Sequence, residues 1–189
     1  MVVLHNWIST PKATTNCSNK PLPQRFLSLD CEFVQCGNRH ALARISIVDE
    51  QCKTVLDSYV RPTERITNFI TFVSGITYEH IKHATTWQEL RPKVESLLRN
   101  CSVVGHTTHS DLKVMEMEGW KGFRSVIDIS KCSVYRDEQN RIQGLKKLAA
   151  KHLSHSIQKS SHCSVEDASA TMKLFLLNKP TILREQQFI

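Results

Sequence analysis

The sequence predicts an α/β fold in which one mixed, five-stranded sheet is flanked by helices. Three observations support this prediction. Strand-like segments joined by short polar turns follow one another between residues 25 and 60. From residue 86 onward, apolar residues recur at helical spacing, and short apolar runs alternate with these amphipathic segments. Short links favour antiparallel neighbours and helical connections favour parallel ones, so three antiparallel strands should be followed by two parallel additions.

The first predicted strand, residues 25–34, alternates apolar and polar side chains. Its odd positions from Leu27 to Phe33 are apolar, and its even positions include Asp30 and Glu32. Because successive side chains of a strand point to opposite faces, both acids are expected on one face, opposite a continuous apolar face. The next two strands are predicted at residues 41–49 and 54–60.

The remaining elements alternate between helix and strand. Helices are predicted at residues 86–100, 111–119, 144–153 and 164–178, and strands at 102–106 and 125–129. This order predicts a sheet of the ribonuclease H-like kind. We expect residues 1–24 to form an N-terminal arm, 25–178 a single domain, and 179–189 a polar, frayed C-terminal tail.

The charge balance favours a polyanionic partner. The chain has 25 Lys and Arg against 18 Asp and Glu, a net charge of +7, which suits nucleic acid, although a solvated basic face would give the same composition. Seven cysteines without a CxxC pair indicate neither a disulfide framework nor a structural zinc site. No apolar stretch reaches the length of a membrane span, so we expect an intracellular protein without a membrane partner.

Acidic and histidine side chains mark three places where chemistry could occur. Asp30 and Glu32 lie on a strand that is expected to be central, where an unpaired carboxylate pair is costly to bury and bound cations would offset the cost. The alternative is a solvent-exposed face. Asp111 is expected at the start of a helix that follows a strand, either at a functional site or simply interacting with the helix dipole. His106 and His109 nearby are more typical of hydrogen-bonded polar residues than of ligands.

The third place is the start of the last predicted helix. Ser164 is predicted as its N-cap, with Glu166 and Asp167 at the second and third helical positions, where acids also serve capping alone. His162 precedes them and could take a proton from water near neutral pH.

Taken in order, these motifs resemble the DEDDh superfamily of 3′-to-5′ exonucleases, and within it the RNA exonuclease and interferon-stimulated exonuclease group. The resemblance covers about residues 25–178. The segments that carry it are LSLDCEFV (27–34), ALARISIV (41–48), VRP (60–62), VSGIT (73–77), VVGHTTHSDL (103–112), LKKLAAKHL (145–153), SIQ (156–158) and HCSVEDASATMKL (162–174).

The resemblance implies an exonuclease that releases nucleoside 5′-monophosphates from the 3′ ends of single-stranded RNA. It implies that four acids hold two Mg²⁺ or Mn²⁺ ions and that His162 is the general base; the acids are Asp30, Glu32, Asp111 and Asp167. Substrate contacts are expected from Phe33, Cys31, His106 and Lys146, although the lysines of the helix predicted at residues 144–153 also fit a solvated helix face. A monomer located in the nucleus or nucleolus is expected.

The sequence departs from the pattern of the group at several positions. Phe33 and Ile70 stand where Met and Arg are usual near the sugar of the terminal nucleotide, which leaves single-stranded DNA as an additional substrate. Ser110, Ser161 and Cys163 also differ, but all four acids and His162 are present. Two other readings stay open: a catalytically inactive nucleic-acid-binding module, and a hydrolase using Cys163 or Ser164, which lacks a GxSxG elbow.

Overall fold

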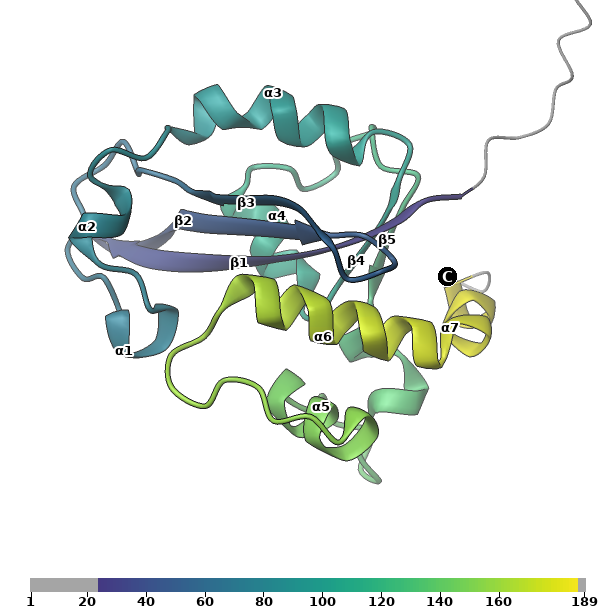
Figure 1. Ribbon diagram of the computed structural model, residues 1–189. Coiled ribbons are helices and arrows are strands. Elements are labelled where there is room, and N and C mark those ends of the chain that lie inside the picture. Colours follow the sequence, from purple (N-terminus) through teal and green to yellow (C-terminus); the bar gives the residue numbers. More distant parts are fainter. Residues whose placement is uncertain (1–23, 187–189) are drawn as a thin grey trace, which may run out of the picture.

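A single five-stranded sheet organises the protein, for which a computed structural model describes residues 24–186 (Figure 1). The strand order is β3-β2-β1-β4-β5. The β1–β2 and β2–β3 pairs are antiparallel, and β1–β4 and β4–β5 are parallel, as the sequence predicts. The strands are β1 (Phe26–Cys36), β2 (Arg39–Val48), β3 (Thr54–Tyr59), β4 (Ser102–Gly105) and β5 (Ser125–Asp128).

Helices cover both faces of the sheet. In Figure 1, α3 lies along one face, whereas α6 and α5 lie on the other. The helices are α1 (Thr71–Ser74), α2 (Tyr78–Ile81), α3 (Trp87–Leu98), α4 (Thr108–Val114), α5 (Leu145–Leu153), α6 (Ser164–Leu177) and α7 (Lys179–Glu185), with 3₁₀ turns at Ile129–Lys131 and Ser133–Tyr135. Among residues 24–186 no helix is both long and apolar enough to cross a membrane.

The central strand β1 sends its side chains alternately into two cores. Leu27 and Leu29 pack in the cluster beneath α3, whereas Phe26 packs in the cluster beneath α6, where its ring lies 4.9 Å from that of Phe175. This alternation places Asp30 and Glu32, which share the parity of Phe26, on the α6 side. The predicted alternation of β1 is therefore confirmed.

One edge of β1 is left uncovered by its neighbour. β1 pairs with β4 only from Phe26 to Ser28, and β4 ends at Gly105. Beyond Ser28 the strand continues to Cys36, with a bulge between Glu32 and Phe33 on its other edge. Near the end of this edge the Gln35 N–H donates to the carbonyl of Asn68 at 2.8 Å, and α4 follows directly after β4.

The start of α4 differs from the predicted start at Asp111. The helix begins at Thr108, because Thr107 adopts the left-handed conformation (φ 58°) and its N–H donates to Asp128 Oδ1 at 2.9 Å. It ends at Val114, just before Glu116, which is also left-handed (φ 52°). Asp111 therefore lies in the middle of α4.

The last two helices also differ from the prediction. Cys163, and not Ser164, is the N-cap of α6, because the Ser164 hydroxyl is buried in a 2.7 Å hydrogen bond with Ser46 Oγ on β2. The described part of the tail is not frayed: α7 spans Lys179–Glu185, and Ile182 is fully buried in the core, while residues 187–189 lie outside the described range. The short helices α1 and α2 were not predicted, because four residues are too few to carry a helical period. The predicted N-terminal arm lies outside the described residues, apart from Gln24.

The cysteines of the described range are all free thiols, as the absence of a spacing pattern predicts. Three of them, Cys31, Cys101 and Cys132, are small buried members of the two main cores. Cys17 lies outside the described residues.

Candidate active site

Four acids from three parts of the chain come together beside β1. Asp30 and Glu32 come from β1, Asp111 from α4 and Asp167 from the first turns of α6. The negative charges of Asp111, Asp167 and Glu32 each act on Asp30, which places all four carboxylates in one cluster. Asp30 is partly exposed and the other three are buried. The four acids that the sequence singles out are therefore brought together.

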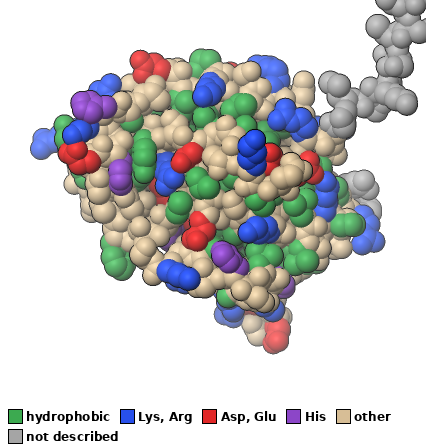
Figure 2. Space-filling view, in the orientation of Figure 1, with side chains coloured by type: hydrophobic (Ala, Val, Ile, Leu, Met, Phe, Trp, Pro, Cys, Tyr) green, Lys and Arg blue, Asp and Glu red, His purple; other side chains and the backbone are tan. Residues whose placement is uncertain are grey.

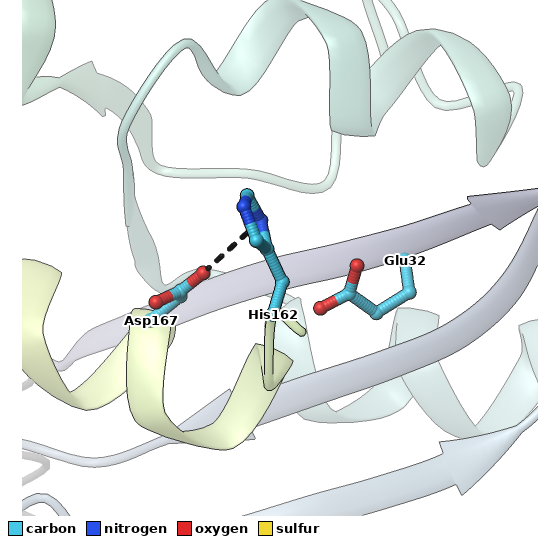
Figure 3. Close-up of side chains that lie close together, drawn as sticks. All are labelled: Glu32, His162 and Asp167. Atoms are coloured by element: carbon cyan, nitrogen blue, oxygen red, sulfur yellow. Dashed lines mark ion pairs between the residues drawn. The ribbon is translucent and has the colours of Figure 1, made fainter. Parts of the chain in front are cut away.

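His162 lies beside two of these acids. Its Nδ1 is 3.7 Å from Asp167 Oδ2, and a nitrogen of its ring and one oxygen each of Glu32 and Asp167 all lie within 4.8 Å of one another (Figure 3). The imidazole is 39% exposed, whereas the Asp167 side chain is only 3% exposed. The histidine thus forms the solvent-facing side of a buried acidic cluster.

Two oxygens in the cluster have no partner within residues 24–186. Glu32 Oε1 and Asp167 Oδ1 are buried and accept no hydrogen bond. Leaving a buried acceptor unsatisfied costs roughly 1–3 kcal/mol, and more when it is charged. An all-oxygen set of ligands suits Mg²⁺ or Mn²⁺, so the residues present fit a divalent cation.

Burial raises the pKa of every acid in the cluster, and repulsion between the four acids adds to this effect at Asp30 and Glu32. Burial, aided by the charges of Asp111, Asp167 and Glu32, raises the pKa of Asp30 well above its ordinary value. Burial and Asp167 raise the pKa of Glu32 to about 8, against the opposing effect of Arg44. Burial raises the pKa of Asp111 to about 7 in spite of hydrogen bonds from the backbone and thiol of Cys31.

Burial likewise raises the pKa of Asp167, although Gln158 and His162 oppose the shift. Near neutral pH the cluster therefore holds protons that a bound cation would displace.

Asp167 is fixed by the loop before α6. Gln158 Nε2 donates to Asp167 Oδ2 at 2.8 Å, and its backbone N–H donates to Glu166 Oε2 at 2.9 Å. The carbonyl of Gln158 accepts a 2.7 Å hydrogen bond from Lys146 Nζ on α5. Sequence reasoning included Gln158 in a matching segment but gave it no role. Lys146, which the sequence predicts to bind substrate, thus donates to Gln158, the residue that positions Asp167.

The loop that carries His162 is held by the VSGIT segment. The His162 N–H donates to the carbonyl of Val73 at 2.7 Å. Gly75 is left-handed (φ 68°), and a Cβ there would lie 2.9 Å from Ser161 Oγ. A glycine is needed both for the backbone conformation and for the close approach of the two loops.

Asp111 is held from two sides. The carboxylate of Asp111 lies beside Cys31 of β1, whose backbone and side chain lower the pKa of Asp111 against the effect of burial. The helix α4 that carries Asp111 follows directly after the strained Thr107, whose N–H donates to Asp128. A β-branched residue rarely adopts a left-handed conformation, so Asp128 offsets a real strain. Sequence reasoning missed Asp128, because its partner Thr107 lies 21 positions away.

A guanidinium lies beside Glu32. Arg44 is opposite Glu32 in the β1–β2 register, and its fork donates to both oxygens of Asp57, at 2.8 and 2.9 Å. Arg44 Nη1 also lies 3.7 Å from Cys163 Sγ. Arg44 thus ties β3, β2 and the start of α6 together next to the acids. The pairing register of β1 and β2 is the signal that could have revealed that Arg44 lies beside Glu32.

The predicted substrate residues have different surroundings. Phe33 is partly buried and stacks on His40, with ring centroids 6.0 Å apart. Cys31 is 6% exposed and its thiol faces Met115, so any substrate contact by Cys31 would be made by its backbone. His106 Nε2 bonds to the carbonyl of Gln143 at 2.8 Å, and His109 pairs with Glu118, which is the hydrogen-bonded role expected of such histidines.

Comparison with known proteins identifies relatives of this fold and site. Residues 27–175 match the exonuclease family (RNase_T). RNA exonuclease 4 of Debaryomyces hansenii is 39% identical over 168 residues, which are 87% of this chain and 61% of that protein. RNA exonuclease 4 of Xenopus tropicalis is 37% identical over 82% of this chain and 38% of its own length. The chain thus spans less than two thirds of the curated relatives that it matches.

Solved structures agree with this result. The catalytic unit of Neurospora crassa Pan2 superimposes with a TM-score of 0.73 at 25% identity, over 90% of this chain and 29% of that one. The Saccharomyces cerevisiae Pan2 module in complex with A7 RNA superimposes with a TM-score of 0.71 at 25% identity, over 89% of this chain and 31% of that one.

Proposed function

The chain belongs to the exonuclease family, and from this premise we propose that it is a 3′-to-5′ exonuclease that requires divalent metal and acts on single-stranded RNA. The observation that carries the proposal is the buried cluster of Asp30, Glu32, Asp111 and Asp167 next to a partly exposed His162. Two of its carboxylate oxygens have no partner among residues 24–186. A bound cation would satisfy these two carboxylate oxygens and offset the cost of burying them.

Each of the site residues has a distinct task in this proposal. The four acids hold two Mg²⁺ or Mn²⁺ ions, which when bound activate the attacking water and stabilise the leaving oxygen of a phosphodiester. His162 removes a proton from the attacking water. Because its Nδ1 faces Asp167, Nε2 is the nitrogen that remains to accept this proton. Gln158 keeps Asp167 in place, and Cys31 lies beside Asp111. The products are a nucleoside 5′-monophosphate and a strand shortened by one nucleotide.

RNA is the proposed substrate because of the names of the relatives. The curated relatives are RNA exonucleases, and the yeast Pan2 structure is of a complex with RNA. Single-stranded DNA remains a second substrate in the proposal, since Ile70 occupies a position where the group usually has an Arg near the sugar. A side-by-side comparison of matched RNA and DNA oligonucleotides measures the preference.

A direct assay tests the proposed activity. A 5′-labelled single strand incubated with Mg²⁺ or Mn²⁺ should shorten one nucleotide at a time, and EDTA should stop the reaction. Asp167→Asn keeps the size of the side chain and its bond from Gln158 but removes a ligand charge, so it should abolish shortening. Equal shortening by the wild type and this variant, or full activity in EDTA, would exclude the metal-dependent mechanism.

We also propose that the protein is a monomer and acts in the nucleus. The support is the resemblance to the RNA exonuclease group together with the net charge of +7. Light scattering of the purified chain measures its mass, and a fluorescent fusion of the full chain reports its compartment. A dimer mass or a purely cytoplasmic signal would contradict these two expectations.

A further inference from the structure

A basic stretch of the chain comprises α5 and the segments on either side of it. Residues 139–165 contain five of the 25 Lys and Arg side chains and none of the 18 Asp and Glu side chains, which leaves 20 against 18 in the rest of the chain. Most of the net charge of +7 therefore comes from this one stretch. Figure 2 shows Lys, Arg and His side chains, with few acidic ones among them, over its lower part, where Figure 1 places α5.

Three lysines of this stretch have no acidic partner in the described part of the chain. Arg141 pairs with Asp137, and the Lys146 ammonium donates to the carbonyl of Gln158. The other three side chains are exposed, and none belongs to an ion pair formed within residues 24–186. We call these three residues the α5 surface: Lys147, Lys151 and Lys159.

The helix holds two of these lysines in line. α5 packs into the core through its buried apolar side chains, so its opposite side faces solvent. Lys147 and Lys151 are four positions apart and lie on one stripe of this side, about 6 Å apart along the helix axis. Lys159 follows Gln158, whose carbonyl accepts a hydrogen bond from Lys146 in the first turn of α5. The three charges therefore lie on and beside one short helix.

One residue connects α5 to the acidic cluster. The carbonyl of Gln158 accepts a hydrogen bond from Lys146 of α5, and its side chain donates to Asp167 Oδ2 at 2.8 Å. In Figure 1 the loop that leaves α5 runs to the start of α6, the helix that carries Asp167. RNA bound to the α5 surface therefore has the acidic cluster within reach of its single-stranded end.

The composition of this region favours contacts with phosphates over contacts with bases. Residues 136–174 contain no Phe, Trp or Tyr. Proteins that bind single strands combine a basic groove with aromatic side chains on which the bases stack. A row of lysines without such rings contacts the backbone alone, and the phosphate backbone is what a double helix presents on its outside.

We propose that the α5 surface binds the phosphate backbone of a double-helical RNA segment that precedes a single-stranded 3′ tail. Lys147 and Lys151 contact phosphates of the stem, and Lys159 contacts a phosphate nearer to the tail. The proposal rests on the proposed function, because it leads the 3′ tail into the acidic cluster. It implies that a stem next to the tail raises the affinity of the protein for RNA and that this gain falls steeply with salt.

A binding experiment tests the α5 surface separately from catalysis. Fluorescence anisotropy in EDTA compares a labelled hairpin RNA that carries a single-stranded 3′ tail with the same tail alone. Lys147→Gln combined with Lys151→Gln should weaken binding of the hairpin about 10- to 50-fold near 0.1 M salt and should lower the slope of log K against log salt by about 1.8. Binding of the tail alone should change by less than about twofold. Glutamine keeps the helix propensity at both positions, so the fold should be unaffected.

A second pair of lysines provides the matched control. Lys93→Gln combined with Lys121→Gln removes equal charge from exposed positions outside the basic stretch, and Lys93 lies on α3, across the sheet from α5 (Figure 1). This pair should change the affinity for either RNA by less than about twofold. Equal weakening by the two pairs, or an equal loss of affinity for the hairpin and for the tail alone, would overturn the assignment of the α5 surface.

Hydrolysis in Mg²⁺ provides the second readout. The variant with both α5 substitutions should lose about tenfold in kcat/KM on the hairpin and should shorten the tail alone at the wild-type rate. A failure of every protein to shorten either RNA would instead overturn the proposed function, and the anisotropy result would still decide whether the α5 surface binds the stem.

Discussion

Asp128 and the acidic cluster are both buried, but their carboxylate oxygens differ in how many hydrogen bonds they accept from the protein. Asp128, 9% exposed, accepts three hydrogen bonds on one oxygen: from the Thr107 N–H at 2.9 Å, the Ser130 N–H at 3.1 Å and the Ser130 hydroxyl at 2.7 Å. Glu32 and Asp167 are equally buried, yet each keeps an oxygen without a partner in the described chain. A structural carboxylate is thus satisfied by protein donors, whereas the acidic cluster keeps acceptors free for a cation.

Changing a carboxylate to an amide should give opposite results at the two sites, and the activity loss at Glu32 is the largest expected effect. Glu32→Gln removes a charge that would hold a cation, which is worth several kcal/mol in the transition state, so kcat should fall roughly 10³-fold. Asp128→Asn keeps a carbonyl oxygen that can accept the same three donors, so its kcat should stay within about threefold of the wild type. Single-turnover cleavage of labelled RNA measures both.

Thermal unfolding of the metal-free variants is the matched control. Glu32→Gln should unfold at or above the wild-type temperature at pH 8, because a buried charge has been removed. A large loss of stability in this variant would mean that the carboxylate of Glu32 is structural, as that of Asp128 is, and would contradict the difference proposed between the two sites.

Removing the acceptor at Asp128 altogether should be the next largest effect. Asp128→Ala leaves three buried or strained donors unsatisfied, and we expect a loss of roughly 2–4 kcal/mol in the free energy of unfolding. Because Thr107 sets the start of α4, the affinity of the Asp111 site for Mn²⁺, measured by calorimetry, should fall by about 10- to 100-fold.

Thr107→Gly provides the test that Asp128 acts through the strained turn. Glycine adopts φ 58° without steric cost, so Thr107→Gly in the Asp128→Ala background should restore part of the Mn²⁺ affinity. Affinity that stays at the level of Asp128→Ala alone would show that Asp128 supports the site by another route.

The acidic cluster should make the metal-free protein less stable as the pH rises. The raised pKa values of Asp30, Asp167, Glu32 (about 8) and Asp111 (about 7) mean that the folded state binds protons more tightly than the unfolded chain. Their favourable contribution to the free energy of unfolding is present at low pH and is lost as the pH rises from about 4 to 8. The loss is on the order of a few kcal/mol in EDTA, and millimolar Mg²⁺ should reverse it. Calorimetric Tm values across this range measure it.

Asp57 serves as an internal reference, because its pKa is shifted in the direction opposite to that of the cluster acids. Burial works to raise the pKa of Asp57, but the hydrogen bonds from Arg44 and Ser46 lower it below its ordinary value. Its contribution is therefore lost as the pH falls below about 4 and is constant where the cluster titrates. A metal-free Tm that rises from pH 5 to 8 would contradict the assignment of raised pKa values to the cluster.

The contrast between the two sites also explains what the sequence could predict. Alternation along β1 is a local property, and it correctly placed Asp30 and Glu32 on one face. The order of the acid motifs, matched to a family pattern, was sufficient to name the four acids and His162. These features depend on residues close in the sequence or on the order of short motifs.

What the sequence could not predict depends on contacts between distant residues. Ser164 was expected as an N-cap, but Ser46, 118 positions away, takes its hydroxyl and leaves the cap to Cys163. The start of α4 was misplaced because Asp128 stabilises a left-handed Thr107 that no local pattern favours. Tertiary hydrogen bonds overrode local preferences at both positions.

The smallest expected effect separates two roles of Lys146. If its contact with the Gln158 carbonyl supports Asp167, Lys146→Met should lower kcat/KM by about two- to tenfold through a higher Mn²⁺ requirement, with an unchanged dependence of KM on salt. If Lys146 instead contacts a substrate phosphate, the salt slope should fall by about 0.7 and the Mn²⁺ requirement should stay constant. Titrations of metal and of salt on one RNA measure both quantities. We expect the first result, because the Lys146 ammonium already donates to the carbonyl of Gln158, whose side chain positions Asp167.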